Sequence, residues 1–268
     1  MLSSAVDAED VVQDAYLRWQ STARSEVASP EAFLRKIVVR LCLDSLKSAR
    51  SRRESYPGLW LPEPILTEIP SEFSDPGDRV GKTESISMAF LLLLESLSPD
   101  ERAVFLLHEV FDYDYDELAM LLEKSNAACR QMFSRAKKHI IDHRLRFQAS
   151  AEQHHQLLAR FVQAVQQGDV AQLTALLAAD AISYSDGGGK AAAATRPVLG
   201  RAAVIQLVLG LMRRTPAGTT VAVELVNGHA ALVFREHGQV QTVMAFAATE
   251  SMIQTLFFVR NPDKLSYV

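Results

Sequence analysis

The stretch SNAACRQMFSRAKKHI, residues 125–140, has the pattern of a helix with one narrow apolar stripe. At about 100° per residue, this stripe is formed by Cys129, Met132, Phe133, Ala136 and Ile140. The opposite face carries only small, polar and basic side chains, namely Ala127, Gln131, Ser134 and Lys138. Such a helix packs on a core with one side and can contact an anionic partner with the other.

The composition indicates a globular protein large enough for two domains, since 48% of its 268 residues are hydrophobic and 22% are charged. No apolar run reaches the roughly 18 residues of a membrane span, and the first ten residues lack a signal-peptide pattern. We therefore expect a cytoplasmic protein with no membrane partner. Cys42 and Cys129 lie in helical apolar patterns without a CxxC motif, which predicts core thiols and no cofactor.

The charges are segregated along the chain, although the net charge is only −4. Residues 100–123 contain eight acidic side chains and one basic one, whereas residues 130–146 contain six Lys or Arg and one Asp. A second basic segment covers residues 31–54. The net charge argues against a protein that coats nucleic acid by bulk electrostatics, but the two basic helices favour local contacts with anions. A solvated helix face is the alternative for either segment alone.

The first half of the chain predicts helices with clear N-terminal caps, at Ser29, Ser98, Asp114 and Ser125. Pro30 and Pro99 follow two of these caps, and Glu117 stands three residues after Asp114, as in a capping box. Two short helices joined by a turn at residues 123–124, the second with a basic exposed face, form a helix-turn-helix pattern. The small residues that open the second helix suit close approach to a major groove.

We predict four segments: a helical domain over residues 1–55, a proline-rich linker over residues 56–82, a helix-turn-helix domain over residues 83–148 and an α+β domain over residues 151–268. The linker is too apolar for a free tether, so part of it should lie on a surface. In the last segment we expect helices over residues 151–166, 170–179 and 201–213, a strand that ends in a glycine turn at residues 186–190, and strands over residues 220–226, 230–235, 240–247 and 252–259. This order predicts one sheet curled around helices.

At these residues the chain resembles a bacterial extracytoplasmic-function (ECF) sigma factor of the branch with a C-terminal SnoaL-like (NTF2-like) extension. DAEDVVQDAYLRW (residues 7–19) is similar to the helix that binds core polymerase, and RLCLDSLKSARSRRE (residues 40–54) to the helix that reads the minus-10 element. Residues 97–140 are similar to the domain that reads the minus-35 element. WLPEP, DGGGK and NPDKL resemble short motifs of that branch. The resemblance implies two all-α sigma domains, the second a helix-turn-helix, followed by an α+β NTF2-like cone.

The resemblance implies that core RNA polymerase and promoter DNA are the partners. In the first helix, Ala8, Val11, Val12, Ala15 and Trp19 are expected to pack, and the opposite face is expected to bind polymerase through Asp10, Gln13, Asp14 and Leu17. Candidate minus-10 contacts are Lys36, Arg40, Asp44, Lys47, Ser48 and Arg50. Candidate minus-35 contacts are Ser125, Asn126, Arg130, Gln131, Ser134, Arg135, Lys137 and Lys138. Family members usually begin with additional helical sequence, so the first domain is expected to be shortened.

The last domain is expected to regulate the sigma domains as a fused unit. The candidate interdomain residues lie in the three short motifs: Trp60, Pro62, Asp186, Gly187, Gly188, Lys190, Asn261, Pro262, Asp263 and Lys264. The glycine turn and the polar tail suit docking on the sigma domains. A sensor of an unknown small molecule in the cone remains an open alternative, and a monomer is the default.

Two further alternatives follow from the same residues. The chain could be a stand-alone helix-turn-helix regulator with a ligand-sensing or enzymatic NTF2-like domain. Polar candidates for catalysis have no diagnostic spacing, and they are Tyr184, Asp186, His229, Arg235 and Glu250. His229 follows a hairpin turn and is expected to be exposed. His139 and His143 lack the acidic partner of a metal motif, so neither a metal site nor an enzyme is expected.

Overall fold

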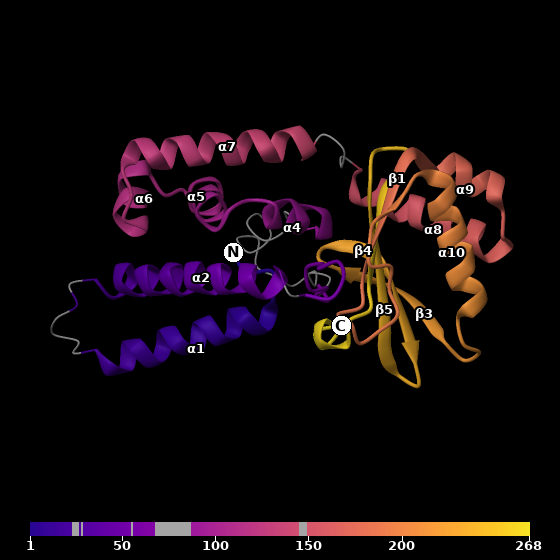
Figure 1. The fold of residues 1–268 in the computed structure, drawn as a ribbon, viewed down its shortest axis with the longest axis horizontal. Helices are drawn as coiled ribbons and strands as arrows, with labels where there is room; N and C mark the ends of the chain where they lie inside the picture. The colour runs from indigo at the N-terminus through magenta and orange to yellow at the C-terminus, as the bar shows by residue number, and fades with distance from the viewer. Residues whose placement is uncertain (23–26, 28, 55, 68–86, 145–148) are drawn as a thin grey trace. The chain divides into compact units, whose positions relative to one another are not determined.

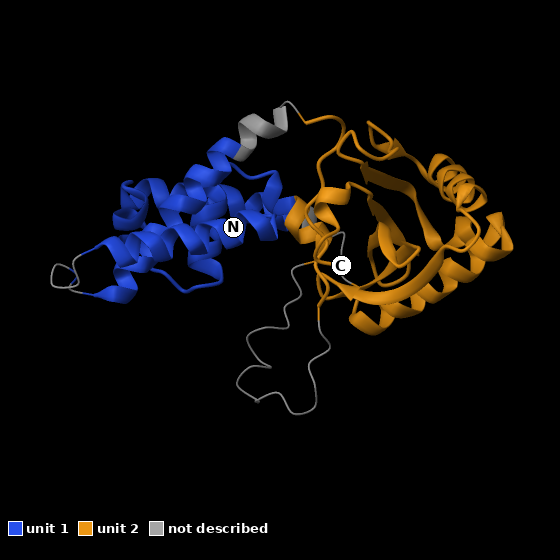
Figure 2. Ribbon diagram, turned by 90° about the horizontal axis from the view of Figure 1, so that it is seen from below, with its two compact units in different colours: residues 1–55, 93–143 blue, residues 56–92, 144–268 orange. Residues whose placement is uncertain are grey.

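The computed structural model describes the whole chain except residues 23–26, 28, 55, 68–86 and 145–148. The described residues divide into two compact units (Figure 2). Unit 1 contains Met1–Ser55 and Leu93–His143, and unit 2 contains Tyr56–Leu92 and Arg144–Val268. Within the described residues, no helix has both the length and the apolar character needed to cross a bilayer.

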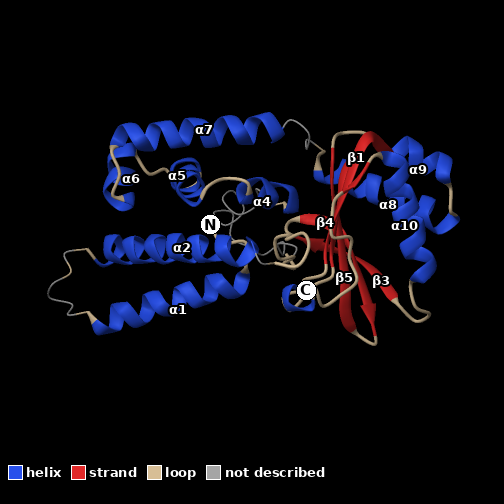
Figure 3. Cartoon of the chain, in the orientation of Figure 1, coloured by secondary structure: helices blue, strands red, loops and turns tan. Residues whose placement is uncertain are grey.

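All regular elements among the described residues of unit 1 are helices (Figures 1 and 3). Its helices are α1 (Ala5–Ser21), α2 (Pro30–Glu54), α5 (Pro99–Glu109), α6 (Tyr115–Leu122) and α7 (Asn126–Arg144), and α4 (Met88–Glu95) crosses the boundary between the units. The predicted caps are confirmed: Ser98 and Asp114 each form a complete capping box, and the Ser125 hydroxyl accepts a hydrogen bond from the Ala128 amide at 3.2 Å.

The core of unit 1 joins the first helical segment to the helix-turn-helix. Val39 and Leu43 of α2 lie in one buried cluster with residues of α5, α6 and α7, namely Ala103, Val104, Leu107, Leu118, Leu122, Cys129 and Met132. The apolar stripe expected on α7 is buried, as Cys129 and Ala136 are fully inaccessible. The two predicted sigma domains therefore belong to one compact unit.

Unit 2 has the α+β architecture predicted from the sequence. Its helices are α8 (Ala151–Gln167), α9 (Val170–Leu176) and α10 (Arg201–Arg214). Its strands are β1 (Leu177–Asp186), β2 (Val198–Leu199), β3 (Thr220–Val226), β4 (His229–Glu236), β5 (Gln239–Ala248) and β6 (Ile253–Val259), in the order β2-β1-β6-β5-β4-β3. The meander β3 to β6 is antiparallel as expected, whereas β1 pairs with β6 in parallel.

Two details of unit 2 differ from the sequence prediction or refine it. The helix predicted to reach residue 179 ends at Leu176, because the chain enters β1 at Leu177. The two predicted hairpin turns are present, with positive φ at Asn227 and Gly228 and at His237 and Gly238. This is the backbone of type I′ turns, which match the twist of the flanking strands.

The two faces of the sheet are covered by different parts of unit 2. Helices α8, α9 and α10 pack on one face around residues such as Phe161, Leu256 and Phe258. The other face is covered by Leu61 of the linker, Met88 and Ala89 of α4, and Leu265 near the C-terminus. Leu66 also forms a β-bridge with Val226 at the end of β3. The described part of the linker is therefore folded onto the sheet.

Replacing Leu61 with alanine should destabilise unit 2 by about 3 kcal/mol, because the side chain is fully buried and its loss leaves a cavity. Leu66→Ala is the matched control in the same segment: Leu66 is 40% exposed, and its substitution should change stability by less than about 0.5 kcal/mol. Urea unfolding followed by Trp60 fluorescence in a Trp19→Phe background measures both. Equal effects of the two substitutions would contradict the packing of Leu61.

Candidate polymerase and promoter interfaces

The candidate polymerase-binding residues form an exposed face of α1. Asp10, Gln13, Asp14 and Leu17 are all exposed, and Leu17 is 53% accessible. The predicted packed stripe is too wide, because Ala8 is exposed and Val12 is 65% accessible. Only Val11 and Ala15 are buried, against Leu41 and Cys42 of α2. A single partner helix covers a narrow seam, so α1 exposes more apolar surface than its periodicity suggests.

The candidate minus-10 residues lie along one exposed side of α2. Lys36, Arg40, Asp44, Lys47 and Ser48 are exposed, while Val39, Leu43 and Leu46 of the same helix are buried. The side chain of Arg50 lies outside the described ones. Arg40 forms an ion pair with Glu123, the left-handed residue that ends α6.

The start of α7 is held by a chain of polar contacts. The Asn126 amide donates to Asp116 of α6 at 2.7 Å, and its oxygen accepts from the Arg130 guanidinium at 2.7 Å. The same guanidinium lies 4.7 Å from the centre of the Tyr115 ring. These contacts fix Arg130 on the exposed face, whereas Gln131 and Ser134 point outward without a described partner in this network.

The remaining basic residues of α7 are partly neutralised by acids of α5. Arg135 pairs with Glu101 at 3.1 Å and Lys137 with Glu109 at 3.4 Å. Lys138 is exposed. A shallow groove of about 510 Å³ runs beside this face and is lined by Tyr115, Arg130, Phe133, Ser134, Lys137, Lys138, Ile141 and Asp142. The groove offers cations and aromatic rings together, which is a surface suited to a phosphate backbone.

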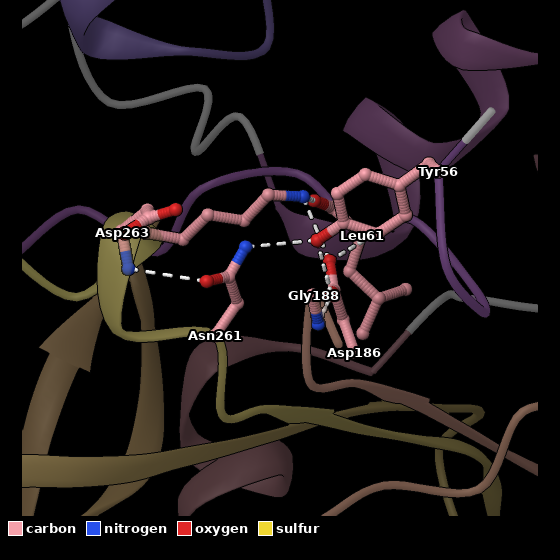
Figure 4. A network of polar contacts seen from close by, with 7 residues as sticks. Tyr56, Leu61, Asp186, Gly188, Asn261 and Asp263 are labelled. Carbon is pink, nitrogen blue, oxygen red and sulfur yellow. Dashed lines mark hydrogen bonds and ion pairs between the residues drawn. The ribbon is translucent and has the colours of Figure 1, made fainter. Parts of the chain in front are cut away.

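In unit 2, the three short motifs meet around the carboxylate of Asp186, which is fully buried (Figure 4). One carboxylate oxygen accepts from the Tyr56 hydroxyl at 2.6 Å and from the Gly188 amide at 3.0 Å. The other accepts from the Leu61 amide at 2.8 Å and from the Lys264 ammonium at 2.7 Å. The linker, the glycine turn and the C-terminal tail therefore share one buried charge.

Lys264 completes this network from the C-terminal tail. Its ammonium also donates to the Leu61 carbonyl and lies 3.6 Å from the centre of the Trp60 ring. The Asn261 side chain donates to the Tyr56 hydroxyl at 2.8 Å. Burial, followed by the hydrogen bond to Asp186, raises the pKa of Tyr56 above its ordinary value. The tyrosine therefore remains a neutral donor.

The glycines of the turn are required by close contacts. A Cβ at Gly187 would lie 2.1 Å from the Ala191 carbonyl oxygen, and one at Gly188, where φ is +58°, would lie 2.4 Å from the Asn261 side chain. At the exposed edge of the Asp186 network, Lys190 pairs with Asp263 at 2.6 Å, and both side chains are more than half exposed. Pro62 is buried, while Pro262 is exposed at the start of the short helix η2 (Pro262–Lys264).

The sequence did not identify Tyr56 or the backbone of Leu61 as members of this site. Tyr56 lies four residues before WLPEP, and an aromatic residue before Pro-Gly is not a specific signal. The turn and the tail, expected to dock on the sigma domains, make their described contacts with the linker and with each other.

The polar candidates for catalysis do not converge. Tyr184 packs on the linker-covered face of the sheet, Arg235 pairs with Glu224, and Glu250 is exposed. His229 is half-buried, which corrects the expected exposure, because its ring lies 5.0 Å from that of His154 on α8. His154 is itself buried, its Nε2 donates to the Phe246 carbonyl at 3.1 Å, and its ring stacks on the Phe246 ring. With a carbonyl partner, its Nε2 is the donor.

Comparison with known families accounts for unit 1. The Sigma-70 region 2 family matches residues 1–52, and the family described as Sigma-70, region 4 matches residues 87–140. The chain belongs to the ECF RNA polymerase sigma factors, which bind core RNA polymerase and direct promoter recognition and transcription initiation. Because region 2 is present, the stand-alone helix-turn-helix regulator is not favoured.

The similarity to individual members of this family extends into unit 2. The ECF RNA polymerase sigma factor SigJ of Mycobacterium tuberculosis is 34% identical over 276 residues, which cover 99% of this chain and 88% of the relative. The crystal structure of that sigma factor aligns with a TM-score of 0.76, over 99% of this chain and 91% of the other. Probable ECF RNA polymerase sigma factor SigI of the same species is 33% identical over 63% of this chain and 58% of its own length.

The stability of unit 2 should fall in mild acid because of His154. Burial lowers the pKa of its imidazole from 6.5 to about 4, so the unfolded chain binds more protons between these values. The resulting loss of folding free energy is absent above pH of about 6.5 and grows as the pH falls towards 4. At pH 5 this loss is about 2 kcal/mol. Between pH 7.5 and pH 5, the free energy of unfolding of the His154→Gln variant should fall by about 2 kcal/mol less than that of the wild type. Urea unfolding followed by Trp60 fluorescence measures both. Identical pH profiles would show that His154 is not the cause.

Proposed function

We propose that the exposed face of α1 is the contact with core polymerase. The observation behind this proposal is an apolar centre at Leu17 surrounded by the polar side chains of Asp10, Gln13 and Asp14. An apolar core with a polar rim is the usual anatomy of a protein interface. We further propose that the exposed side of α2 contacts the minus-10 strand and that the exposed face of α7 contacts the minus-35 duplex.

Leu17→Asp should abolish capture of core polymerase and lower run-off transcription at least tenfold, because it places a charge in the centre of the interface. Val12→Asp is the matched control, since Val12 is also exposed on the same helix but lies about 140° from Leu17 around its axis. The control should retain polymerase capture. Loss of capture in both variants would indicate damage to α1, and retention in both would refute the assignment of this face.

We propose that unit 2 is a fused regulator that restrains the sigma domains through their chain connections. This proposal is based on the Asp186 network, which holds Tyr56 and Leu61 in place. Only residue 55 separates Tyr56 from the end of α2, so fixing Tyr56 limits the reach of region 2. The amide of Ala149, just before α8, also bonds to the Ala248 carbonyl at 3.3 Å. Both DNA-binding segments are thus tethered to one folded unit.

A regulatory role through the chain connections is favoured over catalysis or ligand sensing in the cone. The polar candidates of the cone lie apart, and the helical face of the sheet is filled by side chains such as Phe161, Leu256 and Phe258. A ligand there would have to displace well-packed apolar groups, which costs several kcal/mol. We propose a monomeric cytoplasmic sigma factor without enzymatic activity of its own.

Lys264→Met should release the linker and raise run-off transcription several-fold, because it leaves the Asp186 carboxylate buried without its cation. Lys190→Met is the matched control: it removes the same charge from an exposed pair and should have little effect. Circular dichroism should show that both variants keep the sheet. Unchanged or lower transcription by a folded Lys264→Met protein would argue against restraint through the linker.

A further inference from the structure

We propose that Asp116 and Asn126 are positioning residues for promoter recognition, and that they orient the Arg130 guanidinium towards a guanine of the minus-35 duplex. Asp116 belongs to α6 and acts through Asn126, without touching DNA itself. This role depends on the proposed contact of α7 with the minus-35 duplex. Under it, Arg130 reads one base, and the other two side chains hold it in the direction that reading requires.

The Asn126 amide has one consistent orientation. Its nitrogen donates to the Asp116 carboxylate at 2.7 Å, and its oxygen accepts from Nε of Arg130 at 2.7 Å. A carboxylate only accepts hydrogen bonds and a guanidinium only donates them, so a flipped amide would lose both contacts. The acid of α6 therefore decides which end of the amide faces Arg130.

Two contacts fix the plane of the Arg130 guanidinium. Its Nε is held by Asn126, and its Cζ lies over the Tyr115 ring, 4.7 Å from the ring centre. The Tyr115 ring packs in turn against those of His108 and Phe133, with ring centres at 4.5 and 6.2 Å. An exposed arginine is usually free to rotate, whereas this one has a defined direction.

The terminal nitrogens of Arg130 are left for a partner outside the chain. Nε carries one of the five N–H donors of a guanidinium, and the other four are on Nη1 and Nη2. Neither terminal nitrogen donates to another of the described residues. Two donors in one plane match the N7 and O6 acceptors of guanine, which lie side by side in the major groove. Guanine is therefore the base that this side chain fits.

The place and the restraint of Arg130 favour a base edge over a phosphate. Arg130 is the fifth residue of α7, and residues near the N-terminus of a recognition helix are those that contact base edges. Phosphate contacts carry no sequence information, so they do not require a fixed guanidinium plane. Holding the plane costs side-chain entropy, and a directional pair with a base offsets this cost.

Two substitutions of Asp116 separate positioning from structural support. Asp116→Asn and Asp116→Leu remove the same charge and are nearly equal in size, but only Asn keeps an oxygen that accepts from the Asn126 amide. Each full-length protein, with core polymerase, transcribes a barcoded promoter library randomised in both elements. Sequencing the barcodes of the transcripts gives the base preference at each promoter position.

The wild type should prefer guanine at one upstream position by about 5- to 150-fold, the range of a bidentate base contact. Arg130→Ala should lose this preference at that position alone. Asp116→Leu should lose most of it, because the freed amide no longer orients Arg130, and Asp116→Asn should keep it within about twofold. Preferences at the other upstream positions should stay unchanged in both Asp116 variants.

Equal guanine preference in Asp116→Leu and the wild type would overturn the positioning role, even where Arg130→Ala shows that α7 contacts DNA. An even loss over all upstream positions in Asp116→Leu would mean structural damage and would also refute it, as would a loss of the preference in Asp116→Asn. A wild-type chain without any upstream preference would instead refute the proposed contact of α7 itself.

A modified base gives a readout that needs no change in the protein. In 7-deazaguanine the N7 acceptor is missing, while pairing with cytosine is retained. With this base at the preferred position, run-off transcription by the wild type and by Asp116→Asn should fall about fivefold or more. Transcription by Arg130→Ala should be the same from both templates. Equal transcription from both templates by the wild type would exclude a contact of Arg130 with this guanine.

Discussion

The buried carboxylate of Asp186 is the constraint on which the organisation of unit 2 depends. An isolated charge in an apolar interior is strongly unfavourable, so the fold must bring donors to it. The four donors come from three distant segments: Tyr56 and Leu61 of the linker, Gly188 of the turn and Lys264 of the tail. The network cannot be completed without the linker. A connection between two sigma domains is thereby made a structural part of the C-terminal unit.

Within unit 1, acidic and basic side chains of neighbouring helices also form pairs. The acidic segment before α7 supplies partners for its basic face, as Glu101 and Glu109 pair with Arg135 and Lys137. These pairs are substantially exposed and contribute little to stability. They hold the cations in position, and in the proposed contact of this face with DNA the phosphates must displace the acids. An acidic protein can therefore carry a local basic surface.

Local signals were sufficient for most of the secondary structure. The caps at Ser98 and Asp114 and the turns at Asn227 and His237 were predicted because their chemistry depends on a few neighbouring residues. Contacts between distant segments were not predictable in the same way. No periodicity indicates that β1 lies parallel to β6, that α1 has a single partner helix, or that His154 meets His229. The short motifs indicated which residues matter around Asp186, but not that they bind one another.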